Sequence, residues 1–345
     1  MTDLVALAPA VGPPPRTPPL PLQTVWFGVT LSDLWFVVVF GFLAVFLFLD
    51  GWDFGVGAIF ALGDDHRDRE QCLAAIGPFW DGNEVWLVVF GGGLFAAFPP
   101  AYAALFGRHY LLLFGVLGAL ILRGTAPEFY EQREDEAWRR WWGRAFVAGS
   151  VGAPFQLGVF VGNWLLGADG IALASVVVGL AVVALTVASG AAFLRLKTTG
   201  SLREAMPAVG VRAAAAYLAL VAVALGLLAL RSGVRDALLA PVPVALVAGS
   251  VLLGIGYVVA ARRDRPYLAL GAAGGLTAAL VALVAALLYP TIEPATGLTV
   301  EEAIIGAPAV ELLTAGAAVL IPLVLTYFAV LYSAFSGPID AEEAY

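Results

Sequence analysis

The sequence predicts an all-α fold, a polytopic bundle of transmembrane helices. Of its 345 residues, 61% are hydrophobic and only 13% are charged, and the mean hydropathy is +0.91. Soluble domains carry about twice that share of charge. The apolar runs are close to 20 residues long and lack the alternation of strands. A soluble core could not bury this much apolar surface, so we expect a multi-pass protein of the cell membrane.

We expect about nine helices in one membrane domain over residues 31–340. The predicted spans cover about residues 34–62, 76–98, 101–122, 145–166, 171–194, 208–230, 242–261, 267–289 and 309–335. The run Gly91-Gly92-Gly93 and the glycines of the first span allow helices to approach one another closely.

The two ends of the chain are predicted to lie outside this domain. Residues 1–30 include seven prolines between Pro9 and Pro21, without the basic segment and apolar core of a signal peptide. We expect 1–30 to be a disordered proline-rich tail and 341–345 to be a short C-terminal tail.

Basic residues predict the orientation in the membrane. With the N-terminus outside, 14 of the 18 basic residues fall on the inner side and 4 on the outer side. This asymmetry follows the positive-inside rule. An odd number of spans then places the C-terminus in the cytoplasm.

The charge composition does not distinguish a halophilic source organism from one with a GC-rich genome, and it argues against a nucleic-acid partner. The chain carries a net charge of −8 and a single lysine, Lys197. A high-salt cytoplasm and a GC-rich genome would both favour this composition. Because the chain has no basic patch, we expect no nucleic-acid partner.

Four carboxylates inside the first two spans are the candidate site. Asp50 and Asp53 are three residues apart and share a helix face, and Asp81 and Glu84 repeat that spacing beside Asn83. All four are predicted in the cytoplasmic half of adjacent helices. Charges there are costly and mark ion or proton pathways. Since neither span contains Lys or Arg, we expect these acids to exchange protons along a hydrated path from the cytoplasm.

Structural roles for these acids stay open at this stage. Asp81 and Glu84 also have the spacing of a capping box, with the helix beginning near Gly82. For Asp50 and Asp53 the structural alternative is a hydrogen bond to the backbone or to the second helix, with no part in proton exchange. Glu128 follows a predicted span end, where it would be solvated or paired with Arg123.

The segment WRRWWGR, residues 138–144, combines tryptophan and arginine at a span edge. Such a segment is typical of an anchor in the aromatic belt, and specific lipid binding is the alternative.

Ligands for a redox centre are scarce. The single cysteine, Cys72, excludes disulfides within the chain and thiolate zinc sites. His66 lies in a hydrophilic segment, His109 near an outer span end and Met206 in a predicted loop. We therefore expect no haem or metal bound by this chain alone. No phosphate-binding glycine loop is present.

Several segments resemble subunit II of cytochrome bd-type quinol oxidases. They are DGWDFGVG (50–57), GPFWDGNEVW (77–86), GGGLFAAFP (91–99), ILRGTAPEF (121–129), YPTIEP (289–294), LTVEEAIIGAPAVELL (298–313), LIPLVLTY (320–327) and GPI (337–339). The resemblance is strong over about 34–144 and weaker over 285–340, and between these regions only apolar character matches.

The resemblance implies a nine-helix subunit, here expected as two helical bundles plus a peripheral helix, in a heterodimer with a haem-bearing subunit I. Haems b and d and the quinol site would lie in that partner, which oxidises quinol and reduces dioxygen to water with cytoplasmic protons. Small accessory transmembrane subunits and membrane lipids are further expected partners. Asp81 of the WDGN motif and the Asp50–Asp53 pair would belong to the proton path, with Asn83 and Glu84 beside them.

Two other functions compete with this one. A proton-coupled secondary transporter would also need buried carboxylates near the midplane, but such transporters often contain internal repeats. Neither DGWD nor WDGN recurs in the second half. The other alternative is an assembly partner whose carboxylates serve only as hydrogen-bonding groups. The proline-rich tail and Phe90 depart from the family pattern, which puts quinone or lipid sites in this subunit in doubt.

Overall fold

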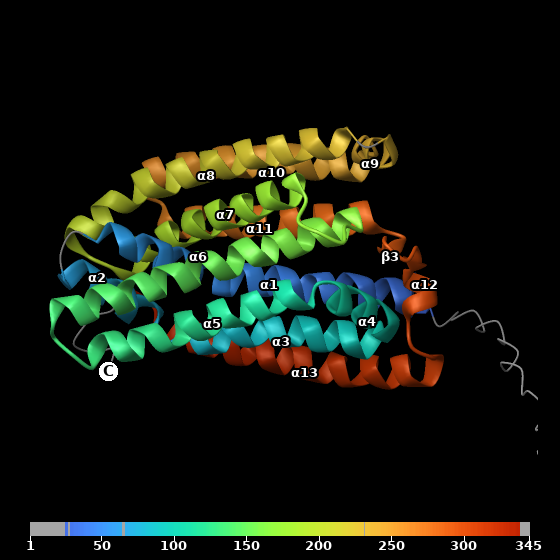
Figure 1. Cartoon of the computed structure of the whole chain (residues 1–345), viewed down its shortest axis with the longest axis horizontal. Helices are drawn as coiled ribbons and strands as arrows, with labels where there is room; N and C mark the ends of the chain where they lie inside the picture. Colours follow the sequence, from blue (N-terminus) through green and yellow to red (C-terminus); the bar gives the residue numbers. More distant parts are fainter. Residues whose placement is uncertain (1–24, 27, 64–65, 231, 339–345) are drawn as a thin grey trace, which may run out of the picture.

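The computed structural model describes residues 25–26, 28–63, 66–230 and 232–338. The long helices are α1 (Leu31–Ile59), α3 (Trp80–Ala97), α5 (Tyr110–Glu131), α6 (Glu136–Leu166), α7 (Leu173–Lys197), α8 (Gly200–Ala229), α10 (Pro241–Arg262), α11 (Pro266–Leu288) and α13 (Ala307–Ala334). Figure 1 shows them running roughly parallel to one axis of an elongated bundle. The all-α prediction is confirmed.

Short elements connect the long helices at the two ends. They are β1 (Val25–Trp26), β2 (Val29–Thr30), the 3-10 helix η1 (Phe60–Leu62), α2 (His66–Ile76), α4 (Pro99–Arg108), α9 (Ser232–Leu238), β3 (Thr291–Glu293), β4 (Leu298–Thr299) and α12 (Val300–Ala303). β1 pairs antiparallel with β2, with Val25 opposite Thr30, and β3 with β4, with Thr291 opposite Thr299. α2 and α4 lie at opposite ends of the bundle (Figure 1).

The described part of the predicted tail is ordered close to the membrane domain. Residues 25–26 and 29–30 form the β1–β2 hairpin, and Thr30 caps α1 by accepting a hydrogen bond from the Asp33 backbone N–H at 3.2 Å. Residues 1–24 and the C-terminal tail 341–345 lie outside the described residues.

Eight helices of the described residues are long and apolar enough to cross a membrane. They include every predicted span except the second, which corresponds to the 18-residue α3. α3 is less apolar because Asp81, Asn83 and Glu84 occupy its first turns. It packs along α1, so it runs within the same bundle.

The third predicted span, 101–122, was wrong in its boundaries. α3 ends at Ala97, and Pro99 and Pro100 occupy the first turn of the separate ten-residue helix α4, where proline is favoured because the backbone N–H groups of a first turn have no helical acceptor. The chain leaves helical geometry at His109, and α5 then runs from Tyr110 to Glu131. This shift moves Arg123 from a predicted loop into a helix.

The core of the bundle is built around α1. α1 packs against α3, α6, α7 and α11, whereas α8 and α10 lie together on one side (Figure 1). In α7, 67% of the residues of its apolar 18-residue stretch are buried within the chain, whereas in α13 only 6% of the corresponding residues are buried. The outward faces of α13 and α10 are therefore apolar surfaces for lipid or another subunit.

Close contact between α1 and α7 depends on glycine. A Cβ on Gly55 would lie 1.9 Å from the Thr186 carbonyl oxygen, and one on Gly190 would lie 2.5 Å from the Gly55 carbonyl carbon. Only the absence of side chains lets the two backbones meet here. This crossing holds the segment of α1 that carries Asp50 and Asp53.

Candidate functional site

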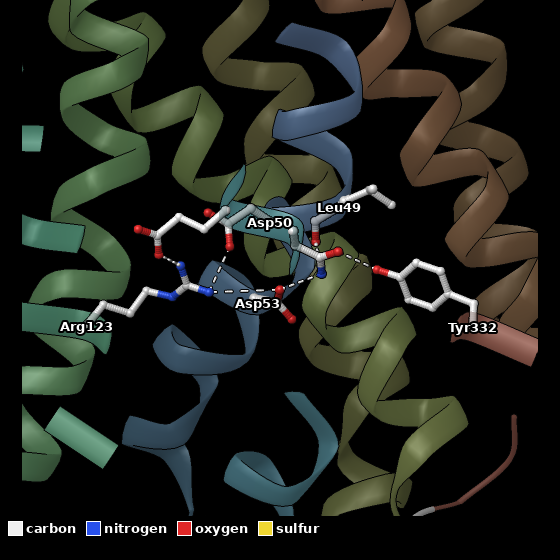
Figure 2. A network of polar contacts seen from close by, with 7 residues as sticks. Leu49, Asp50, Asp53, Arg123 and Tyr332 are labelled. Atoms are coloured by element: carbon white, nitrogen blue, oxygen red, sulfur yellow. Dashed lines mark hydrogen bonds and ion pairs between the residues drawn. The ribbon is translucent and has the colours of Figure 1, made fainter. Parts of the chain in front are cut away.

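A buried polar cluster links α1, α3, α5 and α13 (Figure 2). Asp50 and Asp53 come from α1, Asn83 and Glu84 from α3, Arg123 from α5 and Tyr332 from α13. Asp50, Asp53 and Asn83 are fully buried, and Arg123 is 1% exposed. The structure therefore brings together Asp50, Asp53, Asn83 and Glu84 of the first two predicted spans.

Arg123 occupies the centre of the cluster. Its Nη2 lies 2.8 Å from Asp50 Oδ1 and 3.9 Å from Asp53 Oδ2, and its Nη1 lies 3.3 Å from Glu84 Oε2. Its guanidinium also lies 4.6 Å from the centre of the Phe54 ring, a cation–π distance. The expectation of acids without a nearby cation was wrong, because it depended on Arg123 being in a loop.

Asn83 connects Asp53 to the last long helix. Its Nδ2 donates to Asp53 Oδ2 at 2.7 Å and to the Leu49 carbonyl oxygen at 3.3 Å. The Tyr332 hydroxyl donates to Asn83 Oδ1 at 2.5 Å. Tyr332 was not predicted as a site residue, since an aromatic residue near the end of an apolar span carries no distinguishing signal.

Some carboxylate oxygens in the cluster lack partners. Asp50 Oδ2 and Asp53 Oδ1 are buried and accept no hydrogen bond from the described residues. Buried polar atoms are rarely unsatisfied. These are the oxygens at which water or a proton would bind.

Asp81 stands apart from this cluster. It is exposed on the first turn of α3, three residues before Glu84, and makes no ion pair with the described residues. The capping-box alternative is wrong: α3 begins at Trp80, its N-cap is Phe79, and no side chain caps it. Glu84 bonds to Arg123 instead.

A cavity of about 140 Å³ adjoins the cluster. Arg123 lines it together with Trp80 of α3, the end of α2, and Pro127 and Glu128 of α5. Glu128 is exposed, which agrees with the expectation of a solvated residue, and it makes no ion pair with Arg123. The cavity thus has a buried cation and an exposed acid in its wall.

A larger groove lies elsewhere. A groove of about 950 Å³ runs between α1, α10 and α11, with mostly apolar walls and with Asp33 and Tyr289 among its lining residues. It contains none of the predicted site residues.

The described residues do not fit a haem held by two axial ligands. His109, 5% exposed, lies between α4 and α5, where burial and then the charge of Arg108 lower its pKa. Met206 is not in a loop: it lies in α8, in the apolar cluster with Cys72 of α2, at the other end of the bundle. His66 begins α2 and is exposed. No group of three or more His, Cys, Asp or Glu residues in the described part could hold a metal ion.

A family model described as cytochrome bd terminal oxidase subunit II matches residues 31–335. The chain belongs to this family. Family membership and the eight apolar helices among the described residues make it an integral multi-pass protein of the plasma membrane.

Relatives of the family agree over parts of the chain. Cytochrome bd ubiquinol oxidase subunit 2 of Bacillus subtilis (strain 168) is 37% identical over 189 residues, covering 51% of this chain and 56% of that protein. Cytochrome bd-I ubiquinol oxidase subunit 2 of Escherichia coli (strain K12) is 38% identical over 138 residues, covering 40% and 36%. The matched part thus spans about half the length of these relatives or less.

The fold is also that of a solved oxidase. A chain of the bd oxidase from Geobacillus thermodenitrificans superposes with a TM-score of 0.73, covering 89% of this chain and 99% of that chain at 19% identity. This likeness establishes the shared fold.

Proposed function

We propose that this chain is the haem-free subunit of a quinol:oxygen oxidoreductase of the cytochrome bd type. A partner subunit I would carry haems b and d, oxidise quinol and reduce dioxygen to water. The family match over residues 31–335 supports this assignment. The mismatch between the described His and Met residues and a haem site agrees with redox centres in the partner.

We further propose that the cluster around Arg123 is part of a proton-uptake path from the cytoplasm. One observation carries this proposal: two fully buried carboxylates share a buried arginine that also lines a cavity with the exposed Glu128. Protons would enter at the end of the bundle that carries α2, where the basic residues predict the cytoplasm. Asp81, exposed beside Glu84, would deliver protons from the surface of α3.

Charge balance explains why the cluster can exchange protons. Asp50, Asp53 and Glu84 present three carboxylates to the single guanidinium of Arg123. Full ionisation would leave two negative charges uncompensated inside the membrane, which is costly. A proton shared among the carboxylates relieves this cost, and Asn83 and Tyr332 hold Asp53 in place for the exchange.

The exposed helix faces supply surfaces for assembly. The faces of α13, α10 and α5 are apolar and little buried within the chain. We propose that they meet subunit I, membrane lipids and any small accessory transmembrane subunits. A proton-coupled transporter is not favoured, because the family match covers nearly the whole membrane domain.

Expression with and without the haem-carrying partner tests the proposal. The co-purified pair should consume oxygen with quinol as donor, and the chain alone should show neither oxygen consumption nor a Soret band. A Soret band from the isolated chain, or proton-driven solute uptake by vesicles that contain only this chain, would contradict it.

A further inference from the structure

An arginine-lined pocket opens at the α2 end of the bundle, separate from the Arg123 cluster. Its volume is about 480 Å³, and its walls come from η1, α2 and the first turns of α6. We propose that this pocket binds the phosphate headgroup of an anionic phospholipid.

The lining carries one sign of charge. Its charged residues are Arg69, Arg139, Arg140 and Arg144, and no carboxylate lines it. Arg140 Nη1 lies 3.8 Å from Glu136 Oε2 on the exposed surface, outside the lining. A pocket with this lining attracts an anion.

The guanidinium groups keep donors available for that anion. Arg69 donates to the Gly63 carbonyl oxygen at 3.2 Å, and Arg139 Nε donates to the Arg133 carbonyl oxygen at 3.2 Å. Arg139 Nη1 also contacts His66 Nε2. Each guanidinium has five N–H donors, so these contacts orient the groups without exhausting them. Arginine pairs readily with phosphate through two parallel hydrogen bonds.

The pocket changes from charged to apolar along α6. Arg140, Arg144 and Ala148 are four residues apart and share one helix face, and Val147 continues the lining towards the membrane interior. The Phe60 ring forms the facing wall, where the missing side chain of Gly143 leaves room for it. The charged end of the pocket matches a phospholipid headgroup, and the apolar end matches its acyl chain. A soluble anion would contact only the charged end.

Tryptophans place this end of α6 at the membrane surface. Trp138, Trp141 and Trp142 lie within its first turns, and Trp141 is 71% exposed. Tryptophan concentrates at the headgroup level. Basic pockets between transmembrane helices on the cytoplasmic side bind anionic headgroups. The pocket therefore lies at the depth at which a lipid phosphate is found.

Native mass spectrometry of the delipidated complex tests the proposal. Phosphatidylglycerol and phosphatidylcholine with identical acyl chains are titrated against the wild type and against R140Q/R144Q, whose two arginines are both exposed. The matched control is R262Q/R263Q, which removes the same charge from exposed residues at the end of α10. Each pocket arginine should contribute about fivefold to anionic-lipid affinity, so the double variant should lose roughly 25-fold.

The expected result is a preference of the wild type for phosphatidylglycerol that R140Q/R144Q loses and R262Q/R263Q keeps. Equal binding of the two lipids by the wild type would overturn the proposal. So would an equal loss in the control, which would indicate a general effect of net charge. Full displacement of the lipid by millimolar inorganic phosphate would assign the pocket to a soluble anion instead.

Discussion

Arg123 is the residue on which the buried cluster depends. It is the cation that contacts Asp50, Asp53 and Glu84, and its guanidinium is packed against the Phe54 ring. Removing one partner of a buried ion pair strands the other charges in a medium that solvates them poorly. The stability of the chain and the proposed proton path therefore depend on the same side chain.

Replacing Arg123 by leucine should destabilise the chain strongly. We expect R123L to lose about 3–5 kcal/mol of unfolding free energy, because carboxylates stay buried without a cation. R123K keeps the charge but loses the two-armed contact, so it should lose less. Thermal unfolding of the purified complex in detergent measures both. If R123L unfolded at the wild-type temperature, the ion pairs described here would not contribute to the folded state.

At this scale the sequence predicted the acids but not their partner. Asp50, Asp53, Asn83 and Glu84 were found because polar residues at helical spacing are conspicuous in apolar spans. Arg123 was missed because the predicted span ended one residue before it. The residues that follow it, Gly124 to Phe129, include Pro127 and Glu128, so the sequence contained no clear signal that the helix extends beyond the arginine.

Among the elements, α1 decides the geometry of the site. It carries Asp50 and Asp53, and it is held against α7 at Gly55. Gly51, one turn earlier on the same helix, faces Thr186 with more space: a Cβ there would lie 3.7 Å from Thr186 Cγ2. The two glycines therefore differ mainly in the space that a Cβ atom would have against Thr186.

Alanine substitution should destabilise the chain strongly at Gly55 and only slightly at Gly51. G55A places a methyl group 1.9 Å from the Thr186 carbonyl oxygen, so α1 and α7 must separate. We expect a loss of about 3 kcal/mol or more, at the upper end of overpacking costs. G51A should change stability by less than about 1 kcal/mol. Equal melting temperatures of the two variants in detergent would show that the close crossing is not rigid.

Element boundaries were predicted well only where composition changes sharply. The long helices were predicted because 20-residue apolar runs have few other structures in a membrane. α2 was missed because the first half of its sequence, HRDREQCLAAI, is hydrophilic. The apolar residues of its second half pack against the long helices. Burial raises the pKa of Cys72 in this helix to about 12, so its thiol is a packing group. α4 was merged with α5 because both are apolar.

As a whole molecule, the chain is incomplete by itself. Only 6% of the residues in the apolar 18-residue stretch of α13 are buried within the chain, and 22% in those of α5 and α10. Large apolar faces therefore remain for lipid and partner. We propose that the bundle is organised as two helical bundles with α13 as the peripheral helix, because α13 makes its main helix contacts with α3. Sequence alone could predict the membrane domain but not which faces stay open, since nearly all faces of these helices are apolar.

Quinol-driven oxygen consumption by the assembled complex tests the central claim, that the cluster around Arg123 conducts protons. D50N/D53N keeps the shape of both side chains but removes their exchangeable protons. We predict a fall of about tenfold or more with unchanged haem spectra, a smaller fall for D81N, and none for D236N, which changes an exposed acid in α9. Wild-type oxygen consumption by D50N/D53N with normal haem content would contradict the account and leave the cluster a purely structural role.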